Sequence, residues 1–233
     1  MIEELNESGF CILRETFSPA QCSEFVAQLQ NMFHSEQQNA IGAGQGRVVG
    51  GRNLLDHWNG WRAIWESPVV SDFIAKILGP EAGLVRILYF DKPPGESWAL
   101  SMHKDRTIAV KQHLDPPDPF SRPTTKAGVP HVVANDQTLD RMLTLRLHLD
   151  SMHDDNGPLV VIPGSHAGNS NAELQTIHCQ AGDVFVMRPL LSHSSKAANP
   201  NTTDHRRVIH LEFSADAELA GGYQWHGRKT IHA

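Results

Sequence analysis

The sequence lacks the features that mark membrane-spanning, disulfide-stabilised and nucleic-acid-binding proteins. None of its apolar runs approaches the ~20 residues that a membrane-crossing helix needs. Its three cysteines, Cys11, Cys22 and Cys179, are odd in number and show no CxxC spacing, which favours reduced thiols over a disulfide framework or a zinc knuckle. The net charge is -6 and no basic run occurs, so neither nucleic acid nor a membrane surface is an expected partner.

The first ten residues, MIEELNESGF, carry acids and no apolar segment, so we expect no secretory signal there and a cytoplasmic protein. With 233 residues, 40% of them hydrophobic, the chain can bury the core of one domain, and no internal repeat divides it. We therefore predict a single domain over residues 1–233. The sequence gives no indication of its oligomeric state.

Residues 1–83 are predicted to be mostly helical. A short strand over residues 9–15 precedes a helix over 18–33, for which Ser18 is the expected N-cap. Two further helices are expected over 54–68 and 69–79, after a glycine-rich loop at residues 39–53. Trp58, Trp61 and Trp65 lie at helical spacing in the first of these, a pattern that is more typical of core than of a ligand site.

From residue 84 to 215 the hydrophobic pattern changes to a period of two. Several short strands with turn residues between them predict an all-β sandwich or barrel. Residues 112–135 interrupt the pattern with five prolines, and we predict a lid-like or binding loop there. The expected strands cover residues 84–90, 143–150, 158–164, 183–189 and 207–213.

Two of these strands have one apolar and one polar face. Leucines alternate with Arg146, His148 and Asp150 in the first, and Ile209, Leu211 and Phe213 alternate with Arg206, His210 and Glu212 in the second. If helices cover the apolar face, the polar faces line the concave interior of the sheet, where a polar ligand could bind. If they do not, the polar faces meet solvent. The alternation alone does not distinguish the two.

The motif His-x-acid occurs repeatedly, and five of its copies are candidates. With 14 histidines and 26 acidic residues, chance gives roughly one or two such pairs, so the motif is enriched. A single metal site needs only one pair, so most copies must have no metal-binding role. Two histidines and one carboxylate on one side of a metal, with open positions opposite, suit non-haem Fe(II). Spacing alone does not say which pair would serve. The pairs are His103/Asp105, His113/Asp115, His148/Asp150, His153/Asp155 and His210/Glu212.

Four segments, in this order along the chain, resemble the phytanoyl-CoA dioxygenase family. The resemblance implies a double-stranded β-helix, that is, a mainly β jelly-roll barrel with the N-terminal helices packed on the outer face of its major sheet. It also implies Fe(II) as cofactor, with 2-oxoglutarate and molecular oxygen as co-substrates. The segments are NESGFCILRETFSPAQC at 6–22, YFDKPPGESWALSMHKD at 89–105, DDNGPLVVIPGSH at 154–166, and AGDVFVMRPLLSHSS at 181–195 with RRVIHLEF behind it at 206–213.

The resemblance assigns the iron ligands. The family's metal pair follows a Lys-Pro…Trp stretch, which here corresponds to His103 and Asp105, and its distal histidine closes the strand after Gly182-Asp183, which corresponds to His193. Ser195, two residues later, matches a serine of the family that helps to bind 2-oxoglutarate.

An arginine of the family clamps the far carboxylate of 2-oxoglutarate, because its planar fork forms two parallel hydrogen bonds with a carboxylate. Here the candidates are Arg206 and Arg207. The strand alternation favours Arg206, since Arg207 shares its side with Ile209, Leu211 and Phe213, and the family's pattern agrees.

The chain also departs from the family's pattern. Met102 stands where many members have tryptophan, Lys104 replaces a common glutamine, and Arg146 replaces a tryptophan that lines the co-substrate pocket. Arg146 is therefore predicted to be a second contact for 2-oxoglutarate or to hold an anionic substrate. His166 is interpreted as a structural residue.

We predict an Fe(II)- and 2-oxoglutarate-dependent hydroxylase that releases succinate and CO2. Arg146, His148 and His210 favour a small polar, anionic substrate over a long acyl-CoA. Two other classes stay open: an isomerase or hydrolase that uses Zn²⁺ on the same three ligands, and a non-catalytic jelly-roll binding or sensor protein that has kept the metal triad. Neither needs Arg206.

Overall fold

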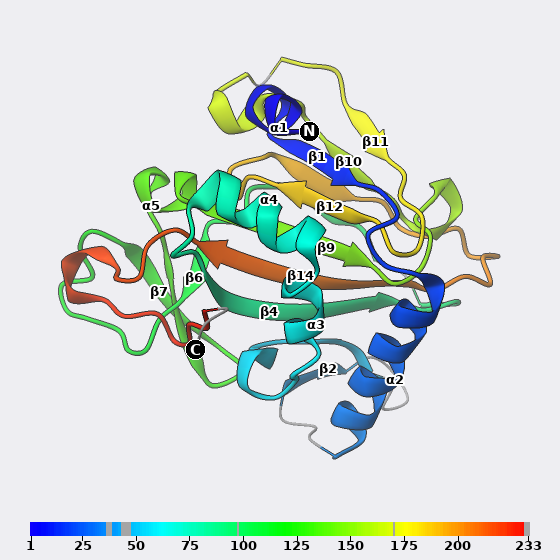
Figure 1. The fold of residues 1–233 in the computed structure, drawn as a ribbon, viewed down its shortest axis with the longest axis horizontal. Helices are drawn as coiled ribbons and strands as arrows, with labels where there is room; N and C mark the ends of the chain where they lie inside the picture. Colours follow the sequence, from blue (N-terminus) through cyan, green and yellow to red (C-terminus); the bar gives the residue numbers. More distant parts are fainter. Residues whose placement is uncertain (36–38, 43–47, 97, 170, 231–233) are drawn as a thin grey trace.

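The structure is a computed structural model that describes residues 1–35, 39–42, 48–96, 98–169 and 171–230. Its helices lie mainly in the first third of the chain, and its strands mainly in the rest (Figure 1). The α-helices are α1 (Ile2–Ser8), α2 (Pro19–Ser35), α3 (Trp61–Trp65), α4 (Pro68–Leu78) and α5 (Asp136–Asp140), and the short 3-10 helices are η3 (Leu54–Asp56), η4 (Asp154–Asn156), η5 (Ser165–Ala167) and η6 (Ala220–Gly222).

The strands form three antiparallel sheets. The major sheet has seven strands in the order β1-β12-β9-β14-β4-β3-β2, the minor sheet has the order β11-β10-β13-β5, and the third has the order β6-β8-β7. The bounds are β1 (Phe10–Leu13), β2 (Ala40–Gly42), β3 (Val48–Gly51), β4 (Gly83–Lys92), β5 (Leu100–His103), β6 (Thr107–Ala109), β7 (Ser121–Lys126), β8 (Val129–Val133), β9 (Met142–His148), β10 (Leu159–Val161), β11 (Gln175–Ile177), β12 (Val184–Met187), β13 (His193–Ser195) and β14 (Arg206–Ser214).

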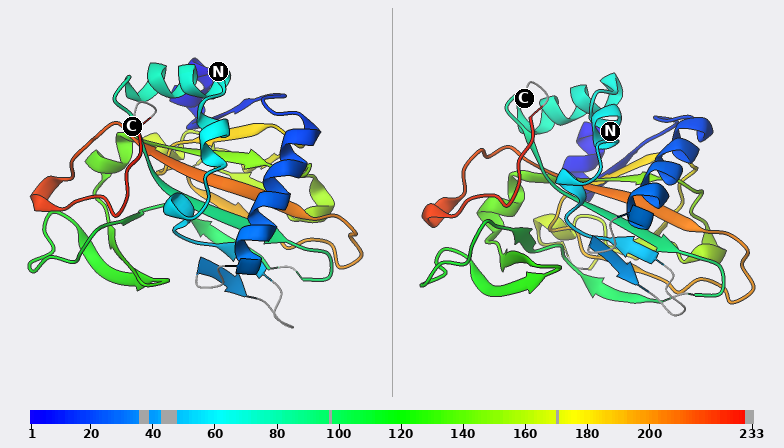
Figure 2. Two further views of the ribbon diagram at one scale, coloured as in Figure 1. Left: turned by 60° about the horizontal axis from the view of Figure 1, so that its bottom comes forward. Right: turned by 90° about the horizontal axis from the view of Figure 1, so that it is seen from below.

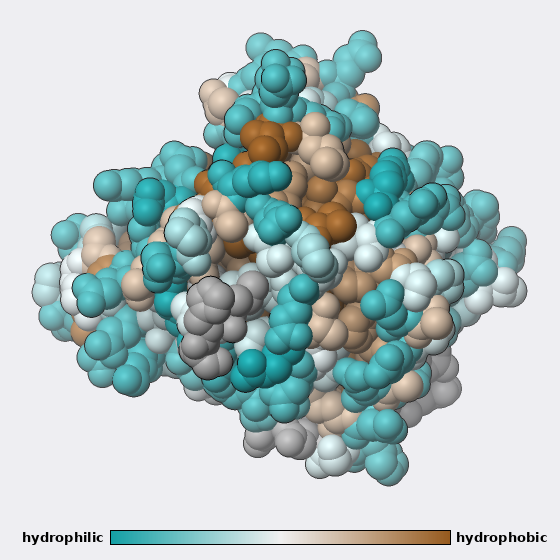
Figure 3. Space-filling model, in the orientation of Figure 1, coloured by the Kyte–Doolittle hydropathy of each residue, from teal (hydrophilic) through white to brown (hydrophobic). Residues whose placement is uncertain are grey.

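Helices cover the outer face of the major sheet, and the other two sheets lie on its inner side (Figure 2). Leu145, Leu147 and Leu211 of the outer face belong to the same buried cluster as Phe25 and Leu29 of α2. Seen from the helical side, the surface is largely hydrophilic, with apolar side chains showing mainly beside α4 (Figure 3). The predicted mainly β jelly-roll with helices on its outer face is confirmed.

The inner face of the major sheet is apolar in one half and polar in the other. Phe10 and Phe185 pack there against Leu159 and Val161 of the minor sheet, which closes this half of the interior. The other half carries the polar rows of β9 and β14. The structure thus decides between the two orientations that the alternation left open: these rows face the interior.

The helix expected over residues 54–68 is wrong in extent. The chain forms η3 and α3 instead, separated by residues 57–60. The Trp58 indole packs edge-on against Phe25, and a Cβ on Gly60 would lie 2.3 Å from that indole. The tryptophan therefore requires a glycine at its side, and the Asn-Gly pair is a poor helix former. Trp58, Trp61 and Trp65 are all buried in the core, as predicted.

The glycine-rich stretch at 39–53 is not simply a loop. Residues 43–47 lie outside the described residues, but β2 and β3 flank them and extend the major sheet past β4. Gly50 and Gly51 let β3 approach its neighbours, because a Cβ there would lie 2.8 Å from the Tyr89 carbonyl oxygen and 2.4 Å from the Phe33 ring.

The segment 112–135, predicted as a lid-like loop, contains regular secondary structure, and its role as a lid stays a prediction. The segment contains the hairpin of β7 and β8, which joins β6 in the third sheet. Pro123 lies in the edge strand β7, where the register shifts between Ser121 and Thr124 and no ladder donor is needed. Phe120 and Val132 are buried in a core cluster of their own. Of the five prolines, Pro123 and Pro130 thus lie within strands, and the other three precede β7.

Two expectations from composition agree with the structure. Cys11, Cys22 and Cys179 are buried and form no disulfide with one another, and burial raises the pKa of each thiol. None of the helices in the described ranges has the length and hydropathy of a membrane-crossing segment.

Asp183 holds the first strand to the barrel. It is fully buried immediately before β12, and its carboxylate accepts hydrogen bonds from the backbone amides of Glu15 and Gln180, both at 2.9 Å. The Arg14 guanidinium donates a third bond of 2.7 Å. This one carboxylate therefore fixes both the chain after β1 and the turn before β12.

We expect Asp183→Ala to lower the free energy of unfolding by about 2–3 kcal/mol, because two partly buried amide donors and a half-exposed guanidinium lose their fully buried acceptor. Urea denaturation measures this. Asp136→Ala is the matched control: it removes a carboxylate whose bond to Arg106 is exposed, and it should cost no more than about 1 kcal/mol. Equal effects of the two substitutions would contradict the role assigned to Asp183.

Candidate metal centre and its pocket

His103, Asp105 and His193 lie together although 88 residues separate the last two. His103 ends β5, His193 begins β13, and the two are directly opposed Cα partners in the minor sheet. Cross-strand partners have Cβ atoms about 5 Å apart, so the register itself brings the imidazoles together, and their ring centroids are 4.3 Å apart. His193 was expected to close the strand after Gly182-Asp183; it begins the next strand instead.

Asp105 completes the group. Its backbone amide donates a 2.9 Å hydrogen bond to the Pro189 carbonyl oxygen, which turns the chain after β5 toward the start of β13. One carboxylate oxygen lies 3.6 Å from Nε2 of His103, and the other lies 3.7 Å from Nε2 of His193. One ligand atom from each of the three residues can be chosen so that all lie within 4.8 Å of one another.

Both imidazoles are oriented by backbone carbonyls. Nδ1 of His103 lies 2.7 Å from the Ser101 carbonyl oxygen, and Nδ1 of His193 lies 2.9 Å from that of Leu191. A carbonyl can only accept, so each Nδ1 carries the proton and donates it. Each Nε2 is left with a free lone pair that faces Asp105, which is how metal-binding histidines are commonly held.

The charge states also suit a cation. Burial, opposed in part by the charge of Asp105, lowers the pKa of His193 to about 4, so its imidazole is neutral at pH 7. Burial would raise the pKa of Asp105, but favourable electrostatic interactions with His193, His210, His103 and Arg146 outweigh it and hold that pKa below its usual value. Neutral imidazole and ionised carboxylate are the forms that ligate a metal.

The other four His-x-acid pairs do not form such a centre. Within the described ranges, His103, Asp105 and His193 are the only group in which three potential ligands converge. The remaining histidines have other surroundings: His113 contacts the Thr124 carbonyl, His148 is buried beneath Arg146 and Arg206, His153 contacts Asp204, and His210 contacts Glu212.

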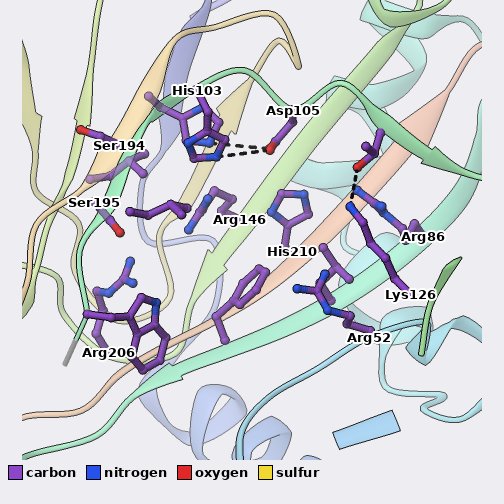
Figure 4. A pocket seen from close by; sticks show the side chains of 17 residues that line it. Arg52, Arg86, His103, Asp105, Lys126, Arg146, Ser194, Ser195, Arg206 and His210 are labelled. Atoms are coloured by element: carbon purple, nitrogen blue, oxygen red, sulfur yellow. Dashed lines mark hydrogen bonds and ion pairs between the residues drawn. The ribbon is translucent and has the colours of Figure 1, made fainter. Parts of the chain in front are cut away.

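A pocket lies beside this centre, between the major sheet, the minor sheet and the β7–β8 hairpin. Its cavity volume is about 180 Å³. Arg146 of β9 and Arg206 and His210 of β14 line it, together with Ser195 of β13. Figure 4 shows these side chains around the metal candidates.

Arg206, Arg146 and Lys92 form what we call the inner basic cluster. Their exposed fractions are only 3%, 8% and 1%. Within the part of the chain that the structure describes, no ion pair joins any of them to a carboxylate. Burial and the charge of Arg146 lower the pKa of Arg206 to about 9, and burial with both arginines lowers that of Lys92 to about 7. Buried, unpaired cations of this kind call for an anionic ligand.

The contacts of Ser195 and Arg207 show that the first faces the pocket and the second does not. Lys92 donates to the Ser195 hydroxyl oxygen over 3.1 Å and to the Lys196 carbonyl over 2.7 Å, which leaves the Ser195 proton free to donate into the pocket. Arg207 instead makes a bidentate pair with Asp150, at 2.8 and 2.6 Å, on the other side of β14.

Sequence reasoning missed four cations at or beside the pocket, one of which, Arg86, lies within the predicted strand 84–90. Lys92 continues the inward alternation of Arg86, Leu88 and Phe90 along β4, a signal that was present but fell just past the predicted strand. Arg52 and Lys126 lie in the two stretches that were expected only as loops. Nothing in their local pattern placed either of them at the pocket.

Comparison with known proteins agrees with this geometry. The family model described as Phytanoyl-CoA dioxygenase (PhyH) matches residues 5–209. No curated protein matches the chain.

Three solved structures have a similar fold at low sequence identity. The iron-bound EctD from S. alaskensis has a TM-score of 0.68 at 16% identity, covering 91% of this chain and 74% of its own. The epimerase SnoN from nogalamycin biosynthesis, described as alpha ketoglutarate dependent, has 0.67 at 17%, covering 97% and 84%. HygX from Streptomyces hygroscopicus, with nickel and 2-oxoglutarate bound, has 0.65 at 13%, covering 97% and 96%.

His103→Ala, Asp105→Ala and His193→Ala should each abolish Fe(II) binding or weaken it by more than about 100-fold, because each removes one of three ligands. Equilibrium dialysis under anaerobic conditions measures the affinity directly. His113→Ala, His153→Ala and His205→Ala are controls that also remove one imidazole each and should bind as wild type does. Wild-type affinity in any of the first three variants would contradict the centre.

Proposed function

Because the chain belongs to the phytanoyl-CoA dioxygenase family, we propose that it is an iron(II)- and 2-oxoglutarate-dependent oxygenase that hydroxylates a small polar metabolite, releasing succinate and CO2. One observation carries the proposal: a His-Asp-His centre with free Nε2 lone pairs shares a pocket with a buried guanidinium that has no carboxylate partner among the described residues. The first feature fits a divalent metal and the second fits a carboxylate.

His103, Asp105 and His193 would hold Fe(II) through two nitrogens and one carboxylate oxygen, the donor set that suits non-haem Fe(II) with open positions. Bound Fe(II) supplies the oxidation, in which O2, 2-oxoglutarate and substrate become succinate, CO2 and oxidised substrate. The carbonyls of Ser101 and Leu191 keep both imidazoles in the tautomer that can ligate. An EctD structure with iron and a HygX structure with nickel and 2-oxoglutarate support this choice of partners.

Arg206 would hold the distal carboxylate of 2-oxoglutarate, with Ser195 donating its free hydroxyl proton to it and Arg146 as the second contact. A fork of two parallel charge-assisted bonds gives both affinity and orientation. A dianion also relieves the repulsion among the three cations of the inner basic cluster. The fit is therefore one of charge as well as of shape.

The reaction is tested by succinate release. The purified protein, loaded with Fe(II) under anaerobic conditions, is given O2, 2-oxoglutarate and a pool of small metabolites, and succinate and consumed metabolites are measured by mass spectrometry. We expect succinate in step with a product that has gained one oxygen atom. An unchanged product mass would point to epimerisation, and metabolite turnover that does not need 2-oxoglutarate would point to a Zn²⁺ isomerase or hydrolase.

Replacing Arg206 should have opposite effects on 2-oxoglutarate binding and on the thermal stability of the ligand-free protein. Arg206→Met should weaken 2-oxoglutarate binding to the nickel-loaded protein by about 30-fold to several thousand-fold, since a buried bidentate contact is worth ~2–5 kcal/mol. The same change should raise the melting temperature of the ligand-free protein, because it removes a buried cation that has no counterion.

Arg207→Met is the matched control. It breaks the ion pair with Asp150 on the outer side of β14 and should change 2-oxoglutarate affinity only a few-fold. It should lower the melting temperature rather than raise it. If the two variants exchange these behaviours, Arg206 is not the clamp.

A further inference from the structure

A second group of cations lies in the pocket, away from the inner basic cluster. Arg52, Lys126 and Arg86 lie on the far side of His210 from Arg146 and Arg206 (Figure 4). Arg52 directly follows β3 and Lys126 ends β7, so they come from segments 74 residues apart. Both are only partly buried, unlike Arg206 and Lys92. We call Arg52 and Lys126 the outer pair.

A hydrogen bond fixes the outer pair in place. The side-chain amide of Asn53 donates to the Lys126 backbone carbonyl over 3.2 Å, which joins the end of β3 to the β7–β8 hairpin. Asn53 is 8% exposed and has a φ of 56°, a left-handed conformation that asparagine tolerates better than most residues. This contact between the two backbone segments therefore holds Arg52 and Lys126 near each other.

Arg86 is compensated, whereas the outer pair is not. Arg86 forms an ion pair with Glu212, and the same carboxylate contacts Nε2 of His210. Among the described residues, Arg52 and Lys126 have no carboxylate partner, and Lys126 donates only to the Thr107 hydroxyl over 3.2 Å. Burial and the charge of Arg86 lower the pKa of both, and Arg52 lowers that of Lys126 further.

Two like charges held side by side facing a cavity are stabilised by an anion. The co-substrate does not fill this role if Arg206 holds it, because the inner basic cluster already supplies three cations for its two carboxylates. We therefore propose that the outer pair binds an oxyanion of the primary substrate, which is a small organic anion with a carboxylate or phosphate group. This deepens the proposed function and rests on it.

The placement has a chemical consequence. With its oxyanion at the outer pair, the substrate extends past His210 toward Asp105 and the two ligand histidines, which line the same pocket. Charge-assisted bonds fix both the position and the orientation of such a ligand. The outer pair would thus select acids over neutral analogues and choose which carbon faces the metal.

Binding of inorganic sulfate to the nickel- and 2-oxoglutarate-saturated protein tests the outer pair without turnover. The inner basic cluster is filled in this complex, so any further sulfate must bind elsewhere. Isothermal titration at constant ionic strength, set with chloride, should show one sulfate site in wild type. Arg52→Gln and Lys126→Gln should each weaken it by about tenfold or more.

Arg122→Gln is the matched control, since Arg122 is an exposed cation on the same hairpin and does not line the pocket. Sulfate affinity in this variant should equal that of wild type. Absence of a sulfate site in wild type, or equal loss in Arg122→Gln and Lys126→Gln, overturns the inference.

The 2-oxoglutarate affinity of each variant distinguishes the two proposals. If wild type does not bind 2-oxoglutarate at all, the proposed function fails. If Arg52→Gln or Lys126→Gln weakens 2-oxoglutarate about tenfold or more, the outer pair serves the co-substrate and the inference fails alone.

A second arm identifies the anion. Carboxylic acids, their amides, and phosphate esters with their alcohols are offered as pairs in the succinate assay. We expect the charged member alone to stimulate succinate release, with a KM that rises about tenfold or more in Arg52→Gln. The preferred charged member separates a carboxylate from a phosphate substrate, and equal stimulation by neutral members contradicts the inference.

Discussion

The interior of this protein is organised by the cost of keeping positive charge away from water. Lys92, Arg146 and Arg206 lie almost fully buried, and none of them forms an ion pair with a carboxylate in the described chain. Such an arrangement is unfavourable in the ligand-free protein, and the rest of the fold must offset it. The continuous apolar layer between the helices and the outer face of the major sheet supplies that offset, because it buries leucine, phenylalanine and tryptophan side chains along almost the whole of β9 and β14.

The same two strands therefore serve both purposes. Along β14, Ile209, Leu211 and Phe213 anchor the strand to the helices, and Arg206 and His210 project from its opposite face into the pocket. A side chain on a strand cannot change faces without moving the register of its neighbours. The packing of the apolar face thus fixes the positions of the pocket residues on the opposite face. In the minor sheet, the pairing of β5 with β13 likewise fixes the positions of His103 and His193.

The sequence predicts those parts of this arrangement that depend on a regular hydrophobic alternation. The alternation in β9 and β14 predicted which residues share a face, and it chose Arg206 over Arg207, in agreement with the pocket and with the Arg207–Asp150 pair. Choosing His103 and Asp105 among five similar pairs needed the resemblance to a family, because spacing cannot show which strands become neighbours. Arg52 and Lys126 could not be predicted: each follows an irregular stretch rich in glycine or proline, and their meeting depends on the Asn53 contact between segments far apart in the chain.

The two groups of cations differ in how deeply they are buried, so the pocket has an inner end and an outer end. Arg206 and Lys92 are closed off from water, whereas Arg52 and Lys126 remain partly open to it. Arg206 and Arg146 line the pocket on one side of His210, and the outer pair lines it on the other (Figure 4). The most deeply buried cations are the most costly to leave unpaired, so an anion held by Arg206 gains more by binding than one held at the outer pair.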